Sequence, residues 1–208
     1  MKKTKRAKKS RTWVIKQHRD QFFKKAKVLG YRSRASFKLI ELNKKFNFIK
    51  KNSNLLDIGS TPGGWSQVAS KIITNGKIIA VDILPMQNID NVIFLKSDFL
   101  EEKTQDKILT MFNKKTDVII SDMAENTTGN KTIDSIRTNN LCSEVVKFSL
   151  KMLTLNGTMV CKLFMGEDFL EVKDLAKKHF KNVEFFKPES SRSESKETYI
   201  FCSSLKTL

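Results

Sequence analysis

Short apolar segments alternate with amphipathic segments along most of the chain, and this alternation limits the possible folds more than any other feature. Alternating strands and helices are typical of a mostly parallel sheet with helices on both faces. The last two apolar segments are only about ten residues apart, without a helix between them, so we expect an antiparallel pair at one edge. The expected strands lie at 54–60, 77–83, 92–98, 117–122, 158–164, 183–187 and 198–204. The sequence therefore predicts an α/β fold with a mostly parallel, seven-stranded sheet.

Apolar residues at helical spacing predict the helices that join these strands. The first helix begins at Ser33, and Lys38 lies on the flank of its apolar stripe, from which it could reach inward. Two further helices are expected at 65–73 and 105–112. The last two helices have the apolar stripes Leu141, Val145, Phe148 and Met152, and Phe169, Val172, Ala176 and Phe180.

The N-terminal segment differs from the rest of the chain in its charge. Residues 1–28 hold 12 Lys or Arg and a single acid, Asp20. We interpret 1–28 as a basic arm, helical from about Trp13, and 29–208 as one domain. A block of one charge is typical of an RNA-binding arm, and a plain solvated tail is the alternative.

The whole chain is basic as well, with 39 Lys and Arg against 22 Asp and Glu and a net charge of +17. Such an excess favours a polyanionic partner, whereas the alternative is a Lys-rich solvated surface. Cys142, Cys161 and Cys202 are odd in number and far apart, which predicts neither a disulfide framework nor a metal site. We expect a cytoplasmic protein, because neither a secretion signal nor a long apolar run is visible.

The first expected strand leads into a glycine-rich turn, DIGSTPGGWSQ at 57–67. Glycines at a strand-to-helix turn let the backbone approach a ligand closely. The spacing matches neither the dinucleotide fingerprint nor the P-loop, so the turn need not cradle phosphates. S-adenosylmethionine is a ligand without phosphates. Trp65, directly after the glycines, is either a core residue or a wall of the cofactor pocket.

Four acids, Asp57, Asp82, Asp98 and Asp122, stand at the ends of successive expected strands, where open α/β sheets bind ligands. Asp82 is suited to the hydroxyl groups of a ribose, and Asp98 to the exocyclic amine of adenine. Asp122 can attract a cationic centre. Each acid taken alone is as compatible with a helix cap or a turn. We interpret the four as lying level with one another around a nucleoside.

These segments carry a specific resemblance. The stretch DIGSTPGGWSQ, with VDILPM at 81–86, SDMA at 121–124 and the KLF strand, resembles the FtsJ/RlmE family of ribosomal RNA large-subunit 2′-O-methyltransferases, from roughly Arg11 to Ser203. The resemblance implies a Rossmann-like methyltransferase fold that uses S-adenosylmethionine. The residues it implies for cofactor contact are Gly63, Trp65, Asp82, Asp98 and Asp122. The family tends to have Pro where this chain has Glu125, in a loop that we expect to cover the substrate.

The resemblance also implies a catalytic set of Lys38, Asp122, Lys162 and Glu197. Lys162 is unusual on physical grounds, because it stands in the apolar run VCKLF, where an unpaired ammonium would cost several kcal/mol. A lysine that snorkels to solvent or lies on an edge strand is the alternative. In our hypothesis Lys162 accepts the proton of the 2′-hydroxyl, Asp122 and Glu197 tune Lys162, and Lys38 positions the ribose. No metal is required.

The resemblance further implies a uridine of 23S ribosomal RNA, within the large subunit, as the acceptor, and we expect a monomer. Two other readings stay open: a 2′-O-methyltransferase for RNA caps or transfer RNA, and a non-catalytic RNA-binding assembly factor of the ribosome. The polar stretch 187–197 contains Arg192, which either holds a phosphate or belongs to a surface turn.

Overall fold

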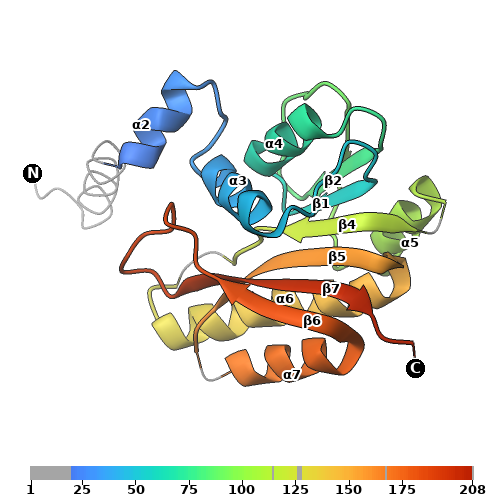
Figure 1. Cartoon of the computed structure of the whole chain (residues 1–208). Helices are drawn as coiled ribbons and strands as arrows, with labels where there is room; N and C mark the ends of the chain where they lie inside the picture. The colour runs from blue at the N-terminus through green and yellow to red at the C-terminus, as the bar shows by residue number, and fades with distance from the viewer. Residues whose placement is uncertain (1–19, 114, 126–127, 167, 208) are drawn as a thin grey trace, which may run out of the picture.

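The computed structural model describes residues 20–113, 115–125, 128–166 and 168–207. Its centre is a seven-stranded sheet in the order β3-β2-β1-β4-β5-β7-β6 (Figure 1). β7 is antiparallel to both of its neighbours, and the other pairs are parallel, as the alternation predicts. The strands are β1 Leu55–Ile58, β2 Ile78–Asp82, β3 Val92–Lys96, β4 Thr116–Ser121, β5 Leu153–Phe164, β6 Phe180–Phe186 and β7 Glu197–Leu205.

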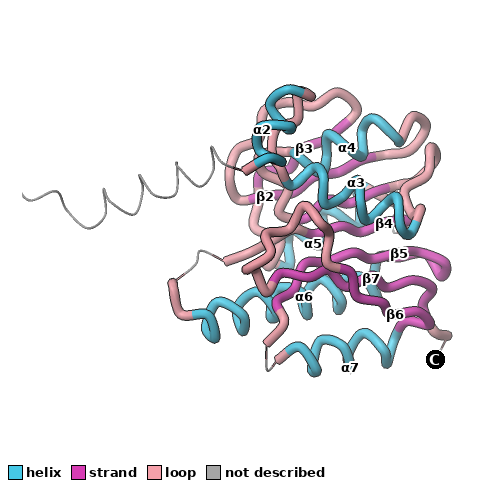
Figure 2. The backbone as a smooth tube through the Cα atoms, turned by 60° about the vertical axis from the view of Figure 1, so that its left-hand side comes forward, coloured by secondary structure: helices cyan, strands magenta, loops and turns pink. Residues whose placement is uncertain are grey.

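Helices cover both faces of the sheet. α3 and α4 pack on one face, and α5, α6 and α7 pack on the other, where α6 and α7 run beside β5, β7 and β6 (Figure 2). No helix in the described ranges is long and apolar enough to cross a membrane. The helices are α2 Gln21–Val28, α3 Ala35–Phe46, α4 Gly64–Ile72, α5 Glu102–Met111, α6 Lys131–Met152 and α7 Phe169–His179.

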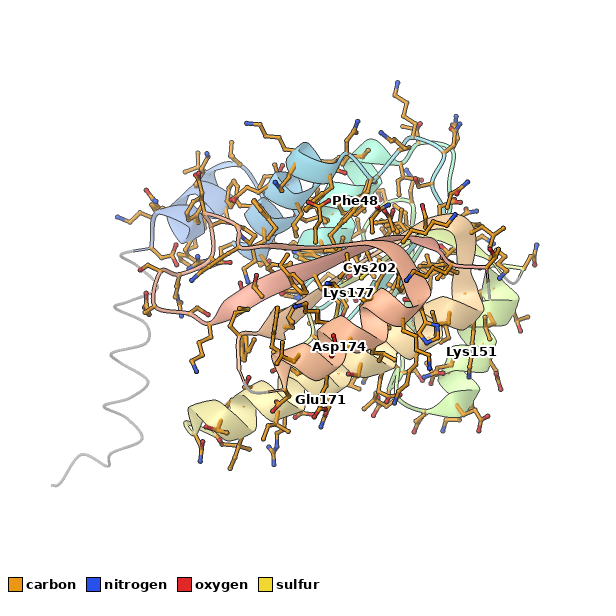
Figure 3. The ribbon with its side chains drawn as sticks, turned by 60° about the horizontal axis from the view of Figure 1, so that its bottom comes forward. Phe48, Lys151, Glu171, Asp174, Lys177 and Cys202 are labelled. Carbon is orange, nitrogen blue, oxygen red and sulfur yellow. The ribbon has the colours of Figure 1, made fainter. Side chains whose placement is uncertain are left out.

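The helices follow the apolar stripes of the sequence. In α7, Val172 and Ala176 are buried, whereas Glu171, Asp174 and Lys177 are exposed on the outer face (Figure 3). In α3, Leu39 and Leu42 are fully buried. Burial of one face supplies most of the stability of such short helices, because isolated helices of this length are marginal in water.

α2 belongs to the segment interpreted as an arm. Asp20 caps it by accepting from the amides of Phe22 and Phe23 at 3.0 and 3.2 Å. The rings of Phe22 and Phe37 lie 5.5 Å apart, so α2 packs on α3. Residues 1–19, including the expected start of a helix at about Trp13, lie outside the described residues, and the division into arm and domain stays a prediction.

The structure corrects three details. Phe180 is not the last residue of the helical stripe: its backbone is extended, and it begins β6 with its ring buried. Asp57 is not level with the other acids, because it pairs with Ala80 inside the sheet, one residue before the end of β1. The pairing of Asp82 with Lys96 leaves Asp98 two residues beyond the level of Asp82. The apolar pattern predicts that a helix or strand is present better than it predicts the residue at which that element ends.

Candidate active site

The glycine turn between β1 and α4 has a backbone that other residues could not easily adopt. Gly59 and Gly63 have φ angles of +75° and +103°. A Cβ on Gly59 would lie 2.3 Å from Met123 Cγ, and one on Gly63 would lie 2.8 Å from Ile89 Cδ1. Both positions therefore need glycine, because the chain after β2 and the chain after β4 pass directly against the turn.

Two of the expected cofactor residues stand where β2 and β3 end, Asp82 as the last residue of β2 and Asp98 two residues after β3. The Asp82 carboxylate accepts from the amides of Thr61 at 2.9 Å and Leu84 at 2.8 Å, so Asp82 joins the turn to the loop after β2. Asp98 is exposed, and its Oδ1 accepts from the amide of Leu100 at 2.9 Å. Each carboxylate oxygen has a second lone pair that these contacts leave available.

The loop that follows β2 is fixed by a residue that the sequence analysis missed. Arg32 donates from Nη1 to the carbonyl of Gln87 at 2.7 Å and from Nη2 to that of Asn88 at 2.5 Å. The same Nη1 lies 3.3 Å from the carbonyl of Pro62 in the glycine turn. Arg32 thus holds the loop and the turn together.

Asp57 and Trp65 are buried beneath the turn. Asp57 accepts from Ser66 Oγ at 2.5 Å, and burial, which disfavours its charged form, raises the pKa of this carboxyl to about 7. Trp65 is 2% exposed, and its indole N–H donates to the carbonyl of Ala35 at 2.8 Å. The side chain of Trp65 is thus a core residue, and its backbone amide stands in the first turn of α4.

Beside the turn, the structure brings together all four residues of the expected catalytic set. Lys38 Nζ lies 2.8 Å from Glu197 Oε1 and 3.9 Å from Asp122 Oδ2. Lys162 Nζ lies 3.1 Å from Asp122 Oδ1 and donates to the Asp122 carbonyl at 2.5 Å. Two buried lysines and two partly buried acids therefore form one charge-balanced cluster from α3, β5, β7 and the end of β4.

The register of the sheet explains why they meet. Lys162 of β5 is directly opposite Tyr199 of β7, so the two side chains share a face. Glu197 precedes Tyr199 by two residues and lies on the same face, because side chains alternate along a strand. α3 covers this face and supplies Lys38. β5 lies between β4 and β7, with Lys162 only 7% exposed, so Lys162 neither occupies an edge strand nor snorkels to solvent.

Tyr199 is the residue of this cluster that the sequence analysis missed. Its hydroxyl donates to Asp122 Oδ1 at 2.6 Å, and the residue is fully buried. Burial and the charges of Asp122 and Glu197 raise the pKa of Tyr199 well above its ordinary value, so the hydroxyl stays a proton donor. The spacing of two residues places Glu197 and Tyr199 on one face of the strand, but no local pattern indicates the contact of Tyr199 with Asp122.

The charges of the cluster act together on Asp122. Burial alone would raise the pKa of the Asp122 carboxyl, but the ammonium groups of Lys162 and Lys38 and the hydroxyl of Tyr199 hold it below its ordinary value. Asp122 is therefore a carboxylate at neutral pH. Among the described residues, no group of three or more His, Cys, Asp or Glu is arranged to hold a metal ion.

Comparison with known proteins assigns this arrangement to a family. Residues 31–205 match the family model described as FtsJ-like methyltransferase. The chain is an FtsJ-like methyltransferase. It is 44% identical to Ribosomal RNA large subunit methyltransferase E of Pelagibacter ubique over 197 residues. This alignment covers 95% of this chain and 97% of that protein. It is also 44% identical to the protein of that name from Rickettsia akari, over 94% of this chain and 89% of that protein.

Solved structures agree with this assignment. A crystal structure named as a ribosomal RNA methyltransferase from Plasmodium falciparum has a TM-score of 0.76 and 34% identity, covering 84% of this chain and 98% of that chain. Human methyltransferase-like protein 13, solved in complex with SAH, has a TM-score of 0.56 and 16% identity over 81% of this chain and 79% of that chain. The second likeness shows the fold alone. Together with the sheet order, these structures confirm the predicted Rossmann-like methyltransferase fold.

Proposed function

We propose that this FtsJ-like methyltransferase transfers a methyl group from S-adenosylmethionine to the ribose 2′-hydroxyl of a uridine in 23S ribosomal RNA of the large subunit. The observation that carries the proposal is the buried cluster of Lys38, Asp122, Lys162 and Glu197 beside the glycine turn. The names of the relatives from Pelagibacter ubique and Rickettsia akari support the ribosomal RNA of the large subunit as the acceptor.

The residues around the turn fit the cofactor. Gly63 presents backbone where a Cβ would crowd its neighbours, and Ser60 Oγ is buried without a hydrogen-bond partner among the described residues. Amide groups in the first turn of α4 favour a carboxylate, because a helix leaves its first amides without internal acceptors. Asp82 and Asp98 would accept from the ribose and adenine of the cofactor, with Gly63 and the backbone of Trp65 beside them.

When bound, S-adenosylmethionine supplies an electrophilic methyl group on a sulfonium. The protein must hold the acceptor hydroxyl on the axis of that bond and remove its proton. Lys162 would first release its own proton to solvent and would then, as the neutral amine, accept the proton of the hydroxyl at Nζ. The carbonyl of Asp122, at 2.5 Å, fixes the position of that nitrogen.

The other members of the cluster place and balance Lys162. Asp122, held by Tyr199, stabilises the ammonium that Lys162 becomes on accepting the proton. Glu197 keeps Lys38 paired at 2.8 Å, and Lys38 can then donate to an oxygen of the ribose. We place this protein in the cytoplasm as a monomer that acts on ribosomal RNA.

A glycine substitution tests the cofactor site. Gly63→Ala is expected to weaken S-adenosylmethionine binding at least about tenfold, because φ of +103° is strained for alanine and the new Cβ would meet Met86 Sδ at 2.9 Å. Calorimetric titration with the cofactor measures the effect. Gly30→Ala is the matched control, since Gly30 also has a positive φ, +69°, but a methyl group added there would have nothing within 4 Å. Equal losses of affinity in both variants would contradict a cofactor role for Gly63.

The proposed activity is tested with methyl-labelled cofactor and purified large subunits from cells that lack the enzyme. We expect label on one uridine of 23S ribosomal RNA, resistant to alkaline cleavage at the modified position because its 2′-oxygen is blocked. Label on a base would refute the 2′-O assignment. Capped messenger RNA and transfer RNA are offered in parallel, and preferential labelling of either would replace the ribosomal substrate.

The same experiment separates the enzyme from a non-catalytic assembly factor. Such a factor would bind RNA but transfer no label to any of these substrates. The paired cluster favours the enzyme, because two lysines and two acids joined by three contacts of 3.9 Å or less form a costly arrangement for a protein that has no use for them.

A further inference from the structure

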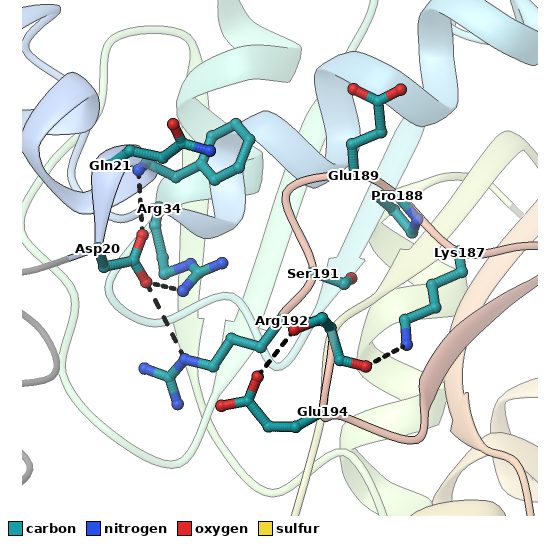
Figure 4. Close-up of a pocket in the computed structure, with 11 residues that line it drawn as sticks. Asp20, Gln21, Arg34, Lys187, Pro188, Glu189, Ser191, Arg192 and Glu194 are labelled. Atoms are coloured by element: carbon teal, nitrogen blue, oxygen red, sulfur yellow. Dashed lines mark hydrogen bonds and ion pairs between the residues drawn. The ribbon is translucent and has the colours of Figure 1, made fainter.

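A groove of about 640 Å³ lies between the start of α2 and the loop that joins β6 to β7. Its walls include Asp20, Phe22, Arg34, Lys187 and Arg192 (Figure 4). The groove thus contains the one arginine, Arg192, of the polar stretch 187–197, to which the proposed reaction gives no role.

Two guanidinium groups in the groove are directed at the same carboxylate. Asp20 Oδ2 pairs with Arg34 Nη1 and lies 4.0 Å from Arg192 Nε (Figure 4). The other oxygen of Asp20 is already used to cap α2. Burial, followed by the positive charge of Arg192, lowers the pKa of Arg34, while Glu197 and Glu194 act in the opposite direction. The two guanidinium groups therefore share one oxygen of Asp20, in a groove that Glu194 also lines.

The two arginines differ in how firmly they are held. Arg34 also donates to the carbonyl of Ser190, and its side chain is 19% exposed. Arg192 has its 4.0 Å contact to Asp20 and a side chain that is 44% exposed. Lys187 is tied to its own loop, with Nζ donating to the carbonyls of Ser193 and Ser195 at 3.2 and 2.7 Å. Arg192 is therefore the cation of the groove best able to turn towards a ligand.

The groove is continuous with the catalytic cluster. Ser191, which lines it, donates from Oγ to Glu197 Oε1 at 2.8 Å. Arg34 precedes Lys38 by four residues, so the two lie on one side of α3 about 6 Å apart along the helix. An RNA strand that places a ribose hydroxyl at Lys162 would thus have its neighbouring sugar-phosphate backbone within reach of the groove.

We propose that this groove binds the RNA strand on the 3′ side of the acceptor ribose, with the guanidinium of Arg192 contacting a phosphodiester. The inference rests on the proposed function, since it takes RNA as the substrate. The 3′-phosphate is attached to the ribose carbon next to the one that carries the 2′-hydroxyl, so it is the phosphate nearest to the reacting oxygen. Guanidinium binds the paired oxygens of a phosphate with a planar, bidentate geometry. Asp20 holds Arg192 until the phosphate replaces it.

The test compares Arg192→Gln with Lys181→Gln in the full chain. Lys181 is an exposed cation near the start of β6, at the end of that strand remote from the groove, so both variants lose one charge. Binding of a short, fluorescein-labelled single-stranded RNA is followed by anisotropy over a range of salt concentrations. Arg192→Gln is expected to weaken binding about tenfold at low salt and to reduce the slope of log K against log salt by about 0.7. Lys181→Gln is expected to change affinity by less than about twofold.

Two more variants test the mechanism. Arg192→Lys should keep the salt slope and recover part of the affinity, because it retains the charge without the planar fork. Asp20→Asn keeps a residue that can cap α2 but removes the competing charge, so RNA binding should tighten. Weaker binding by Asp20→Asn would show that Asp20 does not compete with the RNA.

The outcomes separate this site from the proposed reaction. If Arg192→Gln and Lys181→Gln behave alike while labelled subunits are still methylated, the groove proposal is wrong and the reaction stands. If RNA binding depends on Arg192 but no RNA is methylated, the groove stands and the reaction is wrong. At saturating RNA, Arg192→Gln should transfer methyl groups at nearly the wild-type rate. A rate that falls as far as the affinity would place Arg192 in the chemical step and overturn its assignment as a backbone contact.

Discussion

Replacement of Lys162 by alanine is expected to slow methyl transfer by about 10²–10⁴-fold, the usual contribution of a general base. The variant loses the lysine of β5 whose nitrogen lies against both the carbonyl and the carboxylate of Asp122. Cofactor binding should be unchanged, because the contacts of Asp82 that hold the glycine turn, to the amides of Thr61 and Leu84, do not involve Lys162. Single-turnover transfer to large subunits, with calorimetric titration of the cofactor, measures the two effects separately.

The controls distinguish chemistry from folding. Lys162→Met keeps much of the side-chain volume and should be as slow as the alanine variant, although its core remains filled. Lys151→Ala removes an exposed lysine of α6, on the other face of the sheet, and should transfer methyl groups normally (Figure 3). A Lys162→Ala protein that binds the cofactor but keeps more than about a tenth of the wild-type rate would refute the role of Lys162 as the base.

The fold could be predicted from the sequence because apolar periodicity and burial are local properties of each segment. The run 158–164 is an example: its residues had to be buried on both faces, and β5 does lie inside the sheet. The ends of elements depend on weaker preferences. Phe180 fits the apolar stripe of α7 by spacing, yet its extended backbone begins β6 and its ring remains buried.

The candidate site could be predicted only where a residue type was anomalous or a family motif covered it. Lys162 was anomalous in an apolar strand, and the structure brings Asp122 and Lys38 to it. Tyr199 was not anomalous, because an aromatic residue in a buried strand is ordinary. Its contact with Asp122 follows from the pairing of β5 with β7, which no local pattern encodes.

The same limit applies to arginines that join distant segments. Arg32 is separated by more than fifty residues from the loop whose carbonyls it binds. Arg34 meets the carbonyl of Ser190 across most of the chain. Contacts of this kind depend on the final positions of loops. The sequence therefore predicted which polar side chains stand at the strand ends better than it predicted the hydrogen bonds that hold the surrounding loops in place.

The second large effect is expected for Asp122→Asn, which should lower the transfer rate at least about 10²-fold and destabilise the protein at neutral pH by about 2 kcal/mol or more. Asparagine keeps the backbone carbonyl that holds Lys162 and much of the side-chain shape. It removes the negative charge that lies 3.1 Å from Lys162 and 3.9 Å from Lys38. Lys38 would keep Glu197 as its partner at 2.8 Å, whereas the positive charge of Lys162 would lose the carboxylate beside it.

The pH dependence of this stability loss follows from the pKa of Asp122, which the neighbouring ammonium groups hold below its ordinary value of 3.8. A depressed pKa in the folded state contributes stability that is fully present above the unfolded value and is lost as pH falls through the folded value. Denaturant unfolding should therefore show a large difference between wild type and Asp122→Asn at pH 7, which shrinks below about pH 4. Asp117→Asn, the same change at the start of β4, where the carboxylate accepts from the Asn54 amide at 2.8 Å, is the matched control. If Asp122→Asn has a transfer rate and a stability as high as those of Asp117→Asn, the charge of Asp122 has no part in holding the two lysines.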